Sequence, residues 1–190
     1  DYVPPLGAQT YEAAKRFDER AVDVRLDALA THAALAIEES ARRNVDAFGC
    51  ANSALRFEAL ATSAGLFAYE PRSEADLSVT ARNRADNWSG WAGAHDYDAT
   101  RLDAPAIARR ACEKAAWNAE PVDLEPGAYT VILEPEATAE LAYWLLSAMD
   151  ARAAEEGRSF FSKAGGGSLI GERLYDPHMT LRIDPADMLA

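Results

Sequence analysis

The chain contains 190 residues, 49% of them hydrophobic, and its 31 acidic and 19 basic side chains give a net charge of −12. This length fits one large domain or two partial ones, and the apolar fraction is ample for a buried core. Because phosphate backbones are bound mainly through Lys and Arg, the acidity argues against direct nucleic-acid binding. It is interpreted as solubility or, alternatively, as a face for a basic partner.

Compartment and redox state follow from a few features. No run of eighteen apolar residues occurs, and the opening residues Asp1 to Pro5 do not resemble a secretion signal. We therefore expect no membrane partner and a cytoplasmic location. Cys50 and Cys112 lie far apart and form no Cys-x-x-Cys motif, which predicts two buried free thiols. The absence of an initial methionine is typical of a processed piece of a longer protein.

The first forty residues predict irregular chain followed by one long helix. Two prolines and a glycine lie before Thr10. From about Tyr11 to Arg43, apolar residues recur at spacings of three and four, which predicts a helix that ends near Asn44. Its predicted apolar stripe consists of Val22, Leu26, Leu29, Ala33 and Ile37.

Residues 45–94 predict a series of short strands. The predicted strands are Val45–Cys50, Leu55–Ala61, Leu66–Tyr69, Leu77–Arg82 and Trp88–Ala94. Asn52-Ser53 and Ser63–Gly65 are predicted turns, and Pro71–Glu74 is a predicted loop because proline breaks a ladder. Leu77, Val79 and Ala81 alternate with polar residues, as in a half-buried strand. Strands at such short intervals must be mostly antiparallel.

A second helix is predicted from Asp103, a capping residue, to about Trp117, with Pro105 in its first turn. Its predicted apolar face consists of Ile107, Ala111, Ala115 and Ala116. The segment 121–127 contains two prolines and a glycine and is interpreted as a boundary. Together these elements predict an α+β fold in which a largely antiparallel sheet is packed with helices.

Beyond the boundary, Tyr129–Leu133 predicts a strand and Glu134-Pro135-Glu136 the start of a helix. That helix is predicted to end near Gly157 and to carry an apolar side formed by Leu141, Trp144, Leu145 and Ala148. Residues 163–168 predict a glycine-rich mobile loop, and Leu174–Ile183 predicts a last strand.

Catalytic motifs are scarce. His32, His95 and His178 do not form a convincing three-ligand zinc set. A surface or helix-packing role is favoured for His32, surface-loop polarity for His95 and a structural role for His178. Gly165–Ser168 lacks the Gly-Lys-Ser/Thr ending of a phosphate loop, and no Gly-x-Ser-x-Gly elbow occurs. Trp88, Trp91 and Tyr97 could stack a base or a sugar, but core filling or a partner surface is the favoured interpretation.

Several short sequence segments, in order from about residue 44 to 185, resemble those of a known family. They are Phe48 with Ala51–Ser53, Gly65–Tyr69, Ala75–Arg82, Ser89–Ala92, Arg101–Asp103, Leu124–Pro135, Gly157–Ser162, Ile170–Leu174, and Asp176-Pro177 with Thr180-Leu181. Their order resembles the TldD/PmbA family of peptidases (family U62, also labelled "modulator of DNA gyrase"). The family-motif positions singled out are Gly157, Arg158, Ser159, Phe160, Gly171, Glu172 and Arg173.

This resemblance implies two domains. Residues 1–124 would form the C-terminal part of an N-terminal α+β domain. Residues 125–190 would form the beginning of a β-rich, protease-type C-terminal domain, truncated here.

The resemblance also implies a role. TldD-type members carry a His-Glu-x-x-x-His helix, in which imidazoles hold zinc and the Glu polarises water. The equivalent stretch here, Ala142–Ser147, contains no good zinc ligand. PmbA/TldE-type members likewise lack the histidines and pair with a TldD-type subunit to form a zinc peptidase that degrades peptides or unfolded proteins. We therefore expect no catalytic or metal-binding residue in this chain and expect zinc in a TldD-type partner. The expected partner is that TldD-type subunit or, alternatively, further copies of this chain in a homo-oligomer.

Two alternatives stay open. One is a stand-alone metallopeptidase with a site around His95 and His178, completed outside this chain. The other is a non-enzymatic binding or scaffold module whose likeness to the family is only structural. Because of these alternatives, the sequence does not decide whether the chain is an enzyme.

Overall fold

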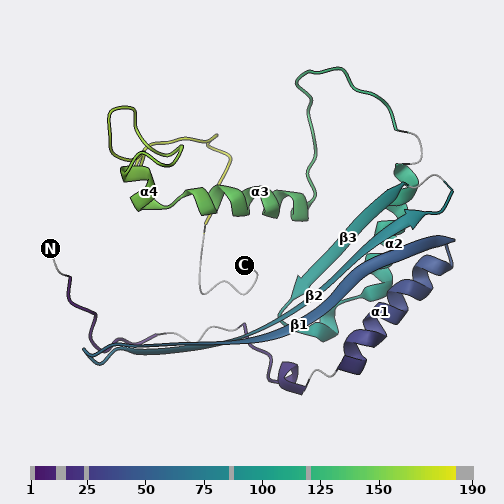
Figure 1. Cartoon of the computed structure of the whole chain (residues 1–190), viewed down its shortest axis with the longest axis horizontal. Helices are drawn as coiled ribbons and strands as arrows, with labels where there is room; N and C mark the ends of the chain where they lie inside the picture. Colours follow the sequence, from purple (N-terminus) through teal and green to yellow (C-terminus); the bar gives the residue numbers. More distant parts are fainter. Residues whose placement is uncertain (1–2, 12–15, 24–25, 86–87, 119–120, 183–190) are drawn as a thin grey trace. The chain divides into compact units, whose positions relative to one another are not determined.

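The computed structural model describes residues 3–11, 16–23, 26–85, 88–118 and 121–182 (Figure 1). The chain divides into two units between Asp123 and Leu124, and each is considered by itself. The first unit holds one sheet and two long helices, and the second holds two helices and loops.

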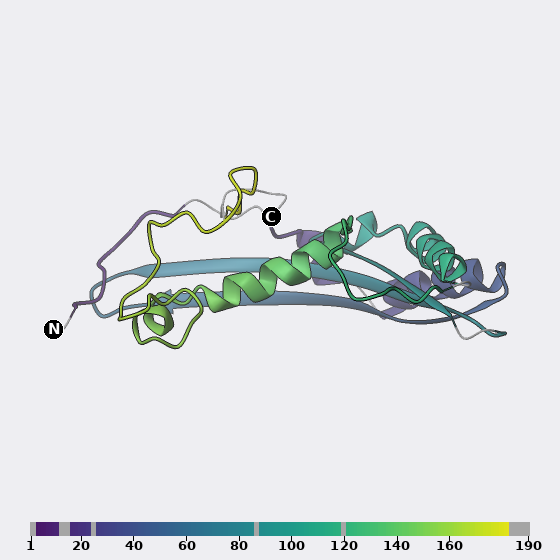
Figure 2. The same cartoon turned by 90° about the horizontal axis from the view of Figure 1, so that it is seen from above.

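The sheet of the first unit has three antiparallel strands in the order β1-β2-β3. β1 (Val45–Ala61) pairs with β2 (Phe67–Asn83) along its whole length, and the two strands run side by side in Figure 2. β3 (Ser89–Asp96) pairs only with residues 75–82 of β2. Residues 54–61 and 67–74 therefore form a two-stranded arm that extends beyond β3.

The prediction of many short strands was wrong in two places. Asn52-Ser53 is not a turn, because both residues pair with β2, and Pro71–Glu74 is not a loop, because all four residues pair with β1. Pro71 lies in the arm, where no β3 residue is beside β2, so its missing N–H interrupts no pairing with β3. The predicted turn at Ser63–Gly65 is confirmed, and Gly65 has φ +92°, which favours glycine.

The long helix predicted before the sheet is only half present. A 3₁₀ helix, η1 (Glu19–Asp23), precedes α1 (Leu26–Ala41), while residues 12–15 and 24–25 lie outside the described residues. The backbone N–H of Asp18 donates to Ser73 Oγ of β2 at 2.9 Å, which takes this donor away from a helical ladder. Asn44 adopts φ +56° in the turn into β1.

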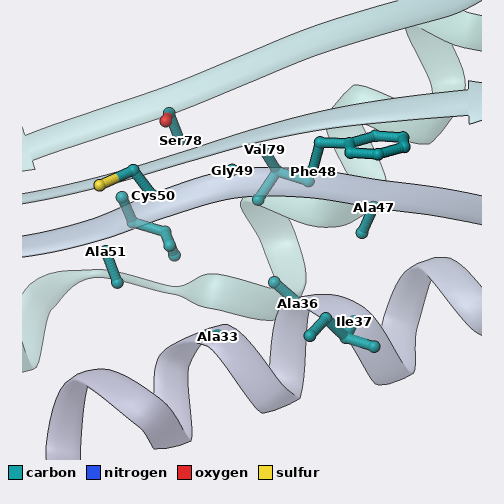
Figure 3. Close-up of a pocket in the computed structure, with 11 residues that line it drawn as sticks. Ala33, Ala36, Ile37, Ala47, Phe48, Gly49, Cys50, Ala51, Ser78 and Val79 are labelled. Atoms are coloured by element: carbon teal, nitrogen blue, oxygen red, sulfur yellow. The ribbon is translucent and has the colours of Figure 1, made fainter.

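α1 lies along β1 (Figure 3), but the predicted apolar stripe is only partly its buried face. Leu29 and Ala33 are half-buried. Val22, Leu26 and Ile37 are exposed, and the positions buried deepest are Ala36, Glu39 and Ser40. The helix therefore packs through small and polar residues and leaves large apolar side chains on its surface.

The second predicted helix is confirmed as α2 (Ala104–Trp117), preceded by η2 (Ala99–Arg101). The Asp103 carboxylate accepts a hydrogen bond from Ala106 N at 3.0 Å, as an N-cap does. Ile107, Ala111 and Ala115 are buried as predicted, but Ala116 is exposed.

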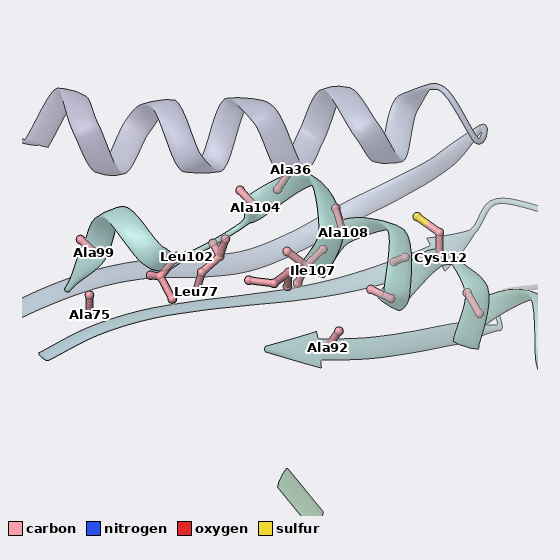
Figure 4. Packing of buried hydrophobic residues seen from close by; sticks show 14 residues of the cluster. Ala36, Ala75, Leu77, Ala92, Ala99, Leu102, Ala104, Ile107, Ala108 and Cys112 are labelled. Atoms are coloured by element: carbon pink, nitrogen blue, oxygen red, sulfur yellow. The ribbon is translucent and has the colours of Figure 1, made fainter. Parts of the chain in front are cut away.

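The core lies between one face of the sheet and helices α1 and α2 (Figure 4). Leu77, Val79 and Ala81 of β2 form its centre and are nearly inaccessible, which confirms the alternation predicted for this strand. A Cβ at Gly90 of β3 would lie 2.2 Å from Ala115 N, so α2 approaches the sheet at a distance that only glycine permits. An α+β fold with an antiparallel sheet packed against helices is therefore confirmed.

The second unit contains α3 (Pro135–Ala148) and α4 (Ala151–Glu155). The predicted helix start at Glu134–Glu136 is confirmed, but the helix ends at Ala148 instead of near Gly157. The glycine-rich loop of residues 163–168 is closed by a bridge between Ser162 and Ser168.

Both strands predicted for the second unit were wrong in the described residues. Tyr129–Leu133 and residues 174–182 are irregular, and Ile183 lies outside the described residues. A strand requires a neighbour for its backbone groups, and no described residue pairs with either segment. Ile132 is 97% exposed as a result.

Candidate functional site

Helix α3 carries Ala142–Ser147, the stretch predicted from the sequence resemblance to stand in place of the zinc-ligand motif. Pro135 occupies its first turn, where the missing N–H costs no intrahelical bond, and Glu136 lies near the positive end of the helix dipole. None of the α3 side chains is buried. The whole stretch Ala142–Ser147 is therefore presented on an exposed or half-exposed helix.

The side chains of this stretch form contacts within α3 itself. Trp144 Nε1 donates to Glu140 Oε1 at 2.9 Å, and the rings of Tyr143 and Trp144 meet edge to face with centroids 5.8 Å apart. Ser147 Oγ donates to the carbonyl oxygen of Tyr143 at 2.8 Å. Zinc in proteins is held by thiolate, imidazole or carboxylate groups, and Ala142–Ser147 offers none of them. These residues do not fit a zinc ion, so no step of a zinc reaction is assigned to them.

Two of the three histidines, His95 and His178, each lie against a nearby carboxylate. His95 Nδ1 lies 2.7 Å from Asp76 Oδ1, and Asn52 Nδ2 donates to the other oxygen of this carboxylate at 3.4 Å. These three residues form a row across β1, β2 and β3. Sequence reasoning missed the row, because it placed a turn at Asn52 and so lost the register that aligns the three side chains.

His178 lies in the second unit, where its backbone N–H and ring lower the pKa of Asp176. His32 is half-buried on α1. Within the described residues, no three or more His, Cys, Asp or Glu side chains gather closely enough to hold a metal ion.

Of the seven family-motif positions, the first four follow α4. Gly157 adopts φ +75° at the end of that helix. Arg158 donates to Glu156 Oε2 at 2.5 Å, and Ser159 Oγ donates to the carbonyl oxygen of Ala148 at 2.9 Å. Phe160 is exposed. Arg158 and Ser159 therefore bind nearby residues of the same chain and position the loop after α4.

The other three motif positions lie in the loop after the glycine-rich segment. Gly171 has φ +87°, and the Glu172 carboxylate lies 2.7 Å from Lys163 Nζ of the glycine-rich loop. Arg173 is exposed. The ion pair joins two loops that are separate in sequence, and it contains no nucleophile held by a base.

A buried polar cluster, which the sequence did not reveal, joins η1 to the end of β3. The Asp98 side chain is only 6% exposed and lies 2.5 Å from Arg20 Nη2. A hydrogen bond from the Thr100 hydroxyl holds the pKa of Asp98 below its ordinary value, and the Arg20 guanidinium acts in the same direction. Ser73 Oγ donates to the carbonyl oxygen of Tyr97 at 2.8 Å. Every charge here is paired, which fits a structural anchor.

A pocket of about 190 Å³ lies between α1 and the β1 edge of the sheet (Figure 3). Its lining is mostly apolar and includes Ala36, Ile37, Ala47 and Ala51. Cys50, predicted to be buried, is exposed on β1, whereas Cys112 is buried as predicted, with Sγ 3.8 Å from Ser40 Oγ.

The fold defines a class: a chain of two units, one an α+β unit built on a three-stranded antiparallel sheet and the other a unit that carries the exposed helix α3. The family profile of the PmbA/TldA metallopeptidase central domain matches residues 9–119, and that of the PmbA/TldA metallopeptidase C-terminal domain matches residues 126–190. The chain belongs to the TldD/PmbA family.

A solved structure has a similar fold. It is a protein from Thermotoga maritima described as a candidate modulator of a DNA gyrase, with 19% sequence identity and a TM-score of 0.54. The similarity covers 58% of this chain and 27% of that chain, so this chain spans about a quarter of its relative. At this identity the likeness shows the fold alone. Comparison with curated proteins gives no match.

In the part of the chain that the structure describes, no helix is both long and apolar enough to cross a membrane.

Proposed function

We propose that this chain is the non-catalytic subunit of a heteromeric, cytoplasmic zinc metallopeptidase that acts on peptides or unfolded proteins. A TldD-type subunit would supply the zinc and the hydrolytic chemistry. Residues 1–124 would close the N-terminal α+β domain of the family, and residues 125–190 would begin its protease-type domain.

One observation carries the proposal. By the family resemblance, Ala142, Tyr143 and Ser147 would stand where TldD-type members have His, Glu and His. A methyl group, a phenol and a hydroxyl that donates to its own helix are poor substitutes for two imidazoles and a carboxylate. This chain therefore depends on another subunit for metal chemistry.

The surface of α3 supports a binding role in place of a catalytic one. Leu141, Tyr143 and Trp144 are each more than half exposed, which is unusual for large apolar side chains on one helix. Aromatic side chains of this kind dominate the energetics of interfaces. We infer that α3 contacts the TldD-type subunit or its peptide substrate.

Co-expression tests the proposal. The full-length protein is purified alone, with a TldD-type subunit, and with that subunit lacking its motif histidines, and each preparation is assayed for cleavage of an unstructured peptide. We expect cleavage only from the pair that retains the histidines. Equal cleavage by the protein alone would overturn the proposal and favour a site elsewhere in the chain.

A matched pair of variants separates binding from folding. Trp144→Ala removes an exposed aromatic side chain from α3, and Trp117→Ala removes an equally exposed one from the end of α2. We expect Trp144→Ala to weaken association with the TldD-type subunit by about tenfold or more. Trp117→Ala should leave association unchanged.

A further inference from the structure

Strand β1 forms an outer edge of the sheet. Among the described residues, β2 is the only strand that pairs with β1, a strand of 17 residues. The N–H and C=O groups of every second residue of β1 therefore face away from the sheet. A long edge of this kind is a template for another strand. Natural proteins usually protect such edges with Lys, Pro, bulges or inward-pointing charges.

The middle of β1 lacks these protections. From Ala47 to Leu55 the sequence is Ala-Phe-Gly-Cys-Ala-Asn-Ser-Ala-Leu, without a charged residue or a proline. In a chain whose net charge is −12, a neutral exposed edge is a local exception. A strand that pairs with residues 47–55 therefore meets no charged side chain of this stretch.

The charges that flank the neutral stretch are symmetric about its centre. Asp46 lies five residues before Ala51, and Arg56 lies five residues after it. If two copies of β1 pair antiparallel with Ala51 opposite Ala51, Asp46 of each copy lies opposite Arg56 of the other. Residues opposite each other in an antiparallel pair lie on the same face of the sheet, so these charges meet directly.

The neighbours of the two charges extend the match. Asp46 Oδ1 lies 2.6 Å from Arg84 Nη2, and Arg56 Nε lies 3.0 Å from Glu74 Oε2. In the paired copies, Arg84, Asp46, Arg56 of the second copy and Glu74 of the second copy form a row of alternating sign. A shift of the register that brings Asp46 opposite Glu58 would instead oppose two carboxylates, which is destabilising.

The helix side of the sheet gives an independent match. Ala47 and Ala51 pair with Ala81 and Leu77, which are buried under the helices, so the odd-numbered residues of β1 face α1. The same register places Leu55 of the second copy opposite Ala47. Ala47 lines the pocket of about 190 Å³ between α1 and the β1 edge, and the exposed Ile37 lines it too. A Leu side chain is therefore available to each pocket.

We propose that two copies of this chain pair through their β1 edges, antiparallel about Ala51, and so form one sheet that continues from copy to copy. The proposal rests on the charge symmetry of β1 and on the pocket, and it is independent of zinc and of the TldD-type subunit.

Charge reversal tests the register. In the full-length protein, Asp46→Arg or Arg56→Asp alone opposes like charges at both ends of the neutral stretch, and we expect the dimer dissociation constant from sedimentation velocity to rise about tenfold or more. An equimolar mixture of the two single variants restores opposite charges at both ends and should restore dimers. The exposed Arg152→Asp in the second unit is the control and should change nothing.

The double variant Asp46→Arg/Arg56→Asp separates pairing between copies from effects within one copy. Like the single variants, it places like charges beside Arg84 or Glu74 inside each chain. Unlike them, it restores opposite charges between the two chains. We expect it to dimerise more tightly than either single variant. If both singles and the double are weakened additively, the charges act only within one chain and the proposal is wrong.

Hydrogen exchange locates the contact. The outward amides of residues 47–55 should become protected as the protein concentration rises through the dimerisation range. A wild-type protein that stays monomeric at high concentration overturns the proposal. So does protection of these amides that is independent of concentration, or that appears only with a TldD-type subunit or an added peptide.

Discussion

The two units of this chain differ in what stabilises each of them internally. The first unit closes a cluster of 14 buried apolar residues between its sheet and its helices, counted among the described residues. The second unit, whose residues 124–182 are all described, buries only Ala154 and Phe161 among its apolar side chains. Its helices start and end through local capping and turn contacts, such as the Asp150 carboxylate that accepts from Ala153 N.

This contrast indicates in which unit substitutions should affect folding and in which they should affect association. The first unit is stabilised by contacts between elements distant in sequence, so core substitutions there should be costly. The second unit exposes Ile132, Trp144 and other large apolar groups, so substitutions there should matter for association more than for folding. Of the four tryptophans, only Trp144 lies in the second unit, so tryptophan fluorescence in a Trp144→Phe background reports on the first unit alone.

The largest effect is expected from Leu77→Ala. Leu77 is 3% exposed at the centre of the core, and its truncation should lower the free energy of unfolding of the first unit by about 4 kcal/mol, measured by urea titration. Leu141→Ala on α3 removes the same atoms from a side chain that is 59% exposed. A cost for Leu141→Ala comparable to that of Leu77→Ala would abolish the distinction between the units.

Gly90→Ala should rank second. The added Cβ would lie 2.2 Å from Ala115 N and 2.3 Å from Ala111 O, both backbone atoms of α2, so the helix must move. We expect a loss of about 3 kcal/mol by the same titration. At Gly127 the added Cβ would meet only the Tyr129 ring at an ordinary 3.5 Å, and Gly127→Ala should leave the first unit unchanged.

Asp98→Asn should cost about 2 kcal/mol at pH 7, because it removes the charge that Arg20 and Thr100 stabilise. The folded-state pKa of Asp98 is lowered, so its contribution is complete above the unfolded pKa of about 3.9 and is lost as the pH falls through the folded value. The stability difference between wild type and variant should therefore shrink below about pH 4.

Asp176→Asn is the matched control for Asp98→Asn. The pKa of Asp176 is lowered too, but the Asp176 side chain is 71% exposed in the second unit. The unfolding of the first unit should be the same in Asp176→Asn and wild type at every pH. A difference that stays constant from pH 7 to pH 3 in Asp98→Asn would show that charge is not the cause.

The smallest effect is expected from Asp103→Ala, which removes the N-cap of α2 and should cost the first unit about 1 kcal/mol. Asp150→Ala removes the equivalent cap of α4. In the Trp144→Phe background, only Asp103→Ala should shift the urea midpoint. An equal shift with Asp150→Ala would mean that the second unit contributes to the folding of the first.

The sequence predicted those parts of the fold that depend on local signals. α2 carries its own cap at Asp103, and the alternation of Leu77, Val79 and Ala81 reports burial directly. The merging of short strands into β1 and β2 was not predictable, because Pro71 normally ends a ladder and only the position of β3 makes it tolerable. Likewise, Tyr129–Leu133 has the composition of a strand but no described neighbour to pair with.

The candidate site was predictable to a similar degree. The lack of zinc ligands in Ala142–Ser147 can be read from residue types alone. The row of Asn52, Asp76 and His95, and the burial of Asp98 beside Arg20, depend on strand register and on the path of η1, which no local pattern encodes.

The most direct test of the central claim is the zinc content of purified full-length protein, measured by mass spectrometry of the metal after dialysis, alone and in complex with a TldD-type subunit. We expect no bound zinc for this protein alone and one zinc per pair in the complex. A stoichiometric zinc in the protein alone would contradict it.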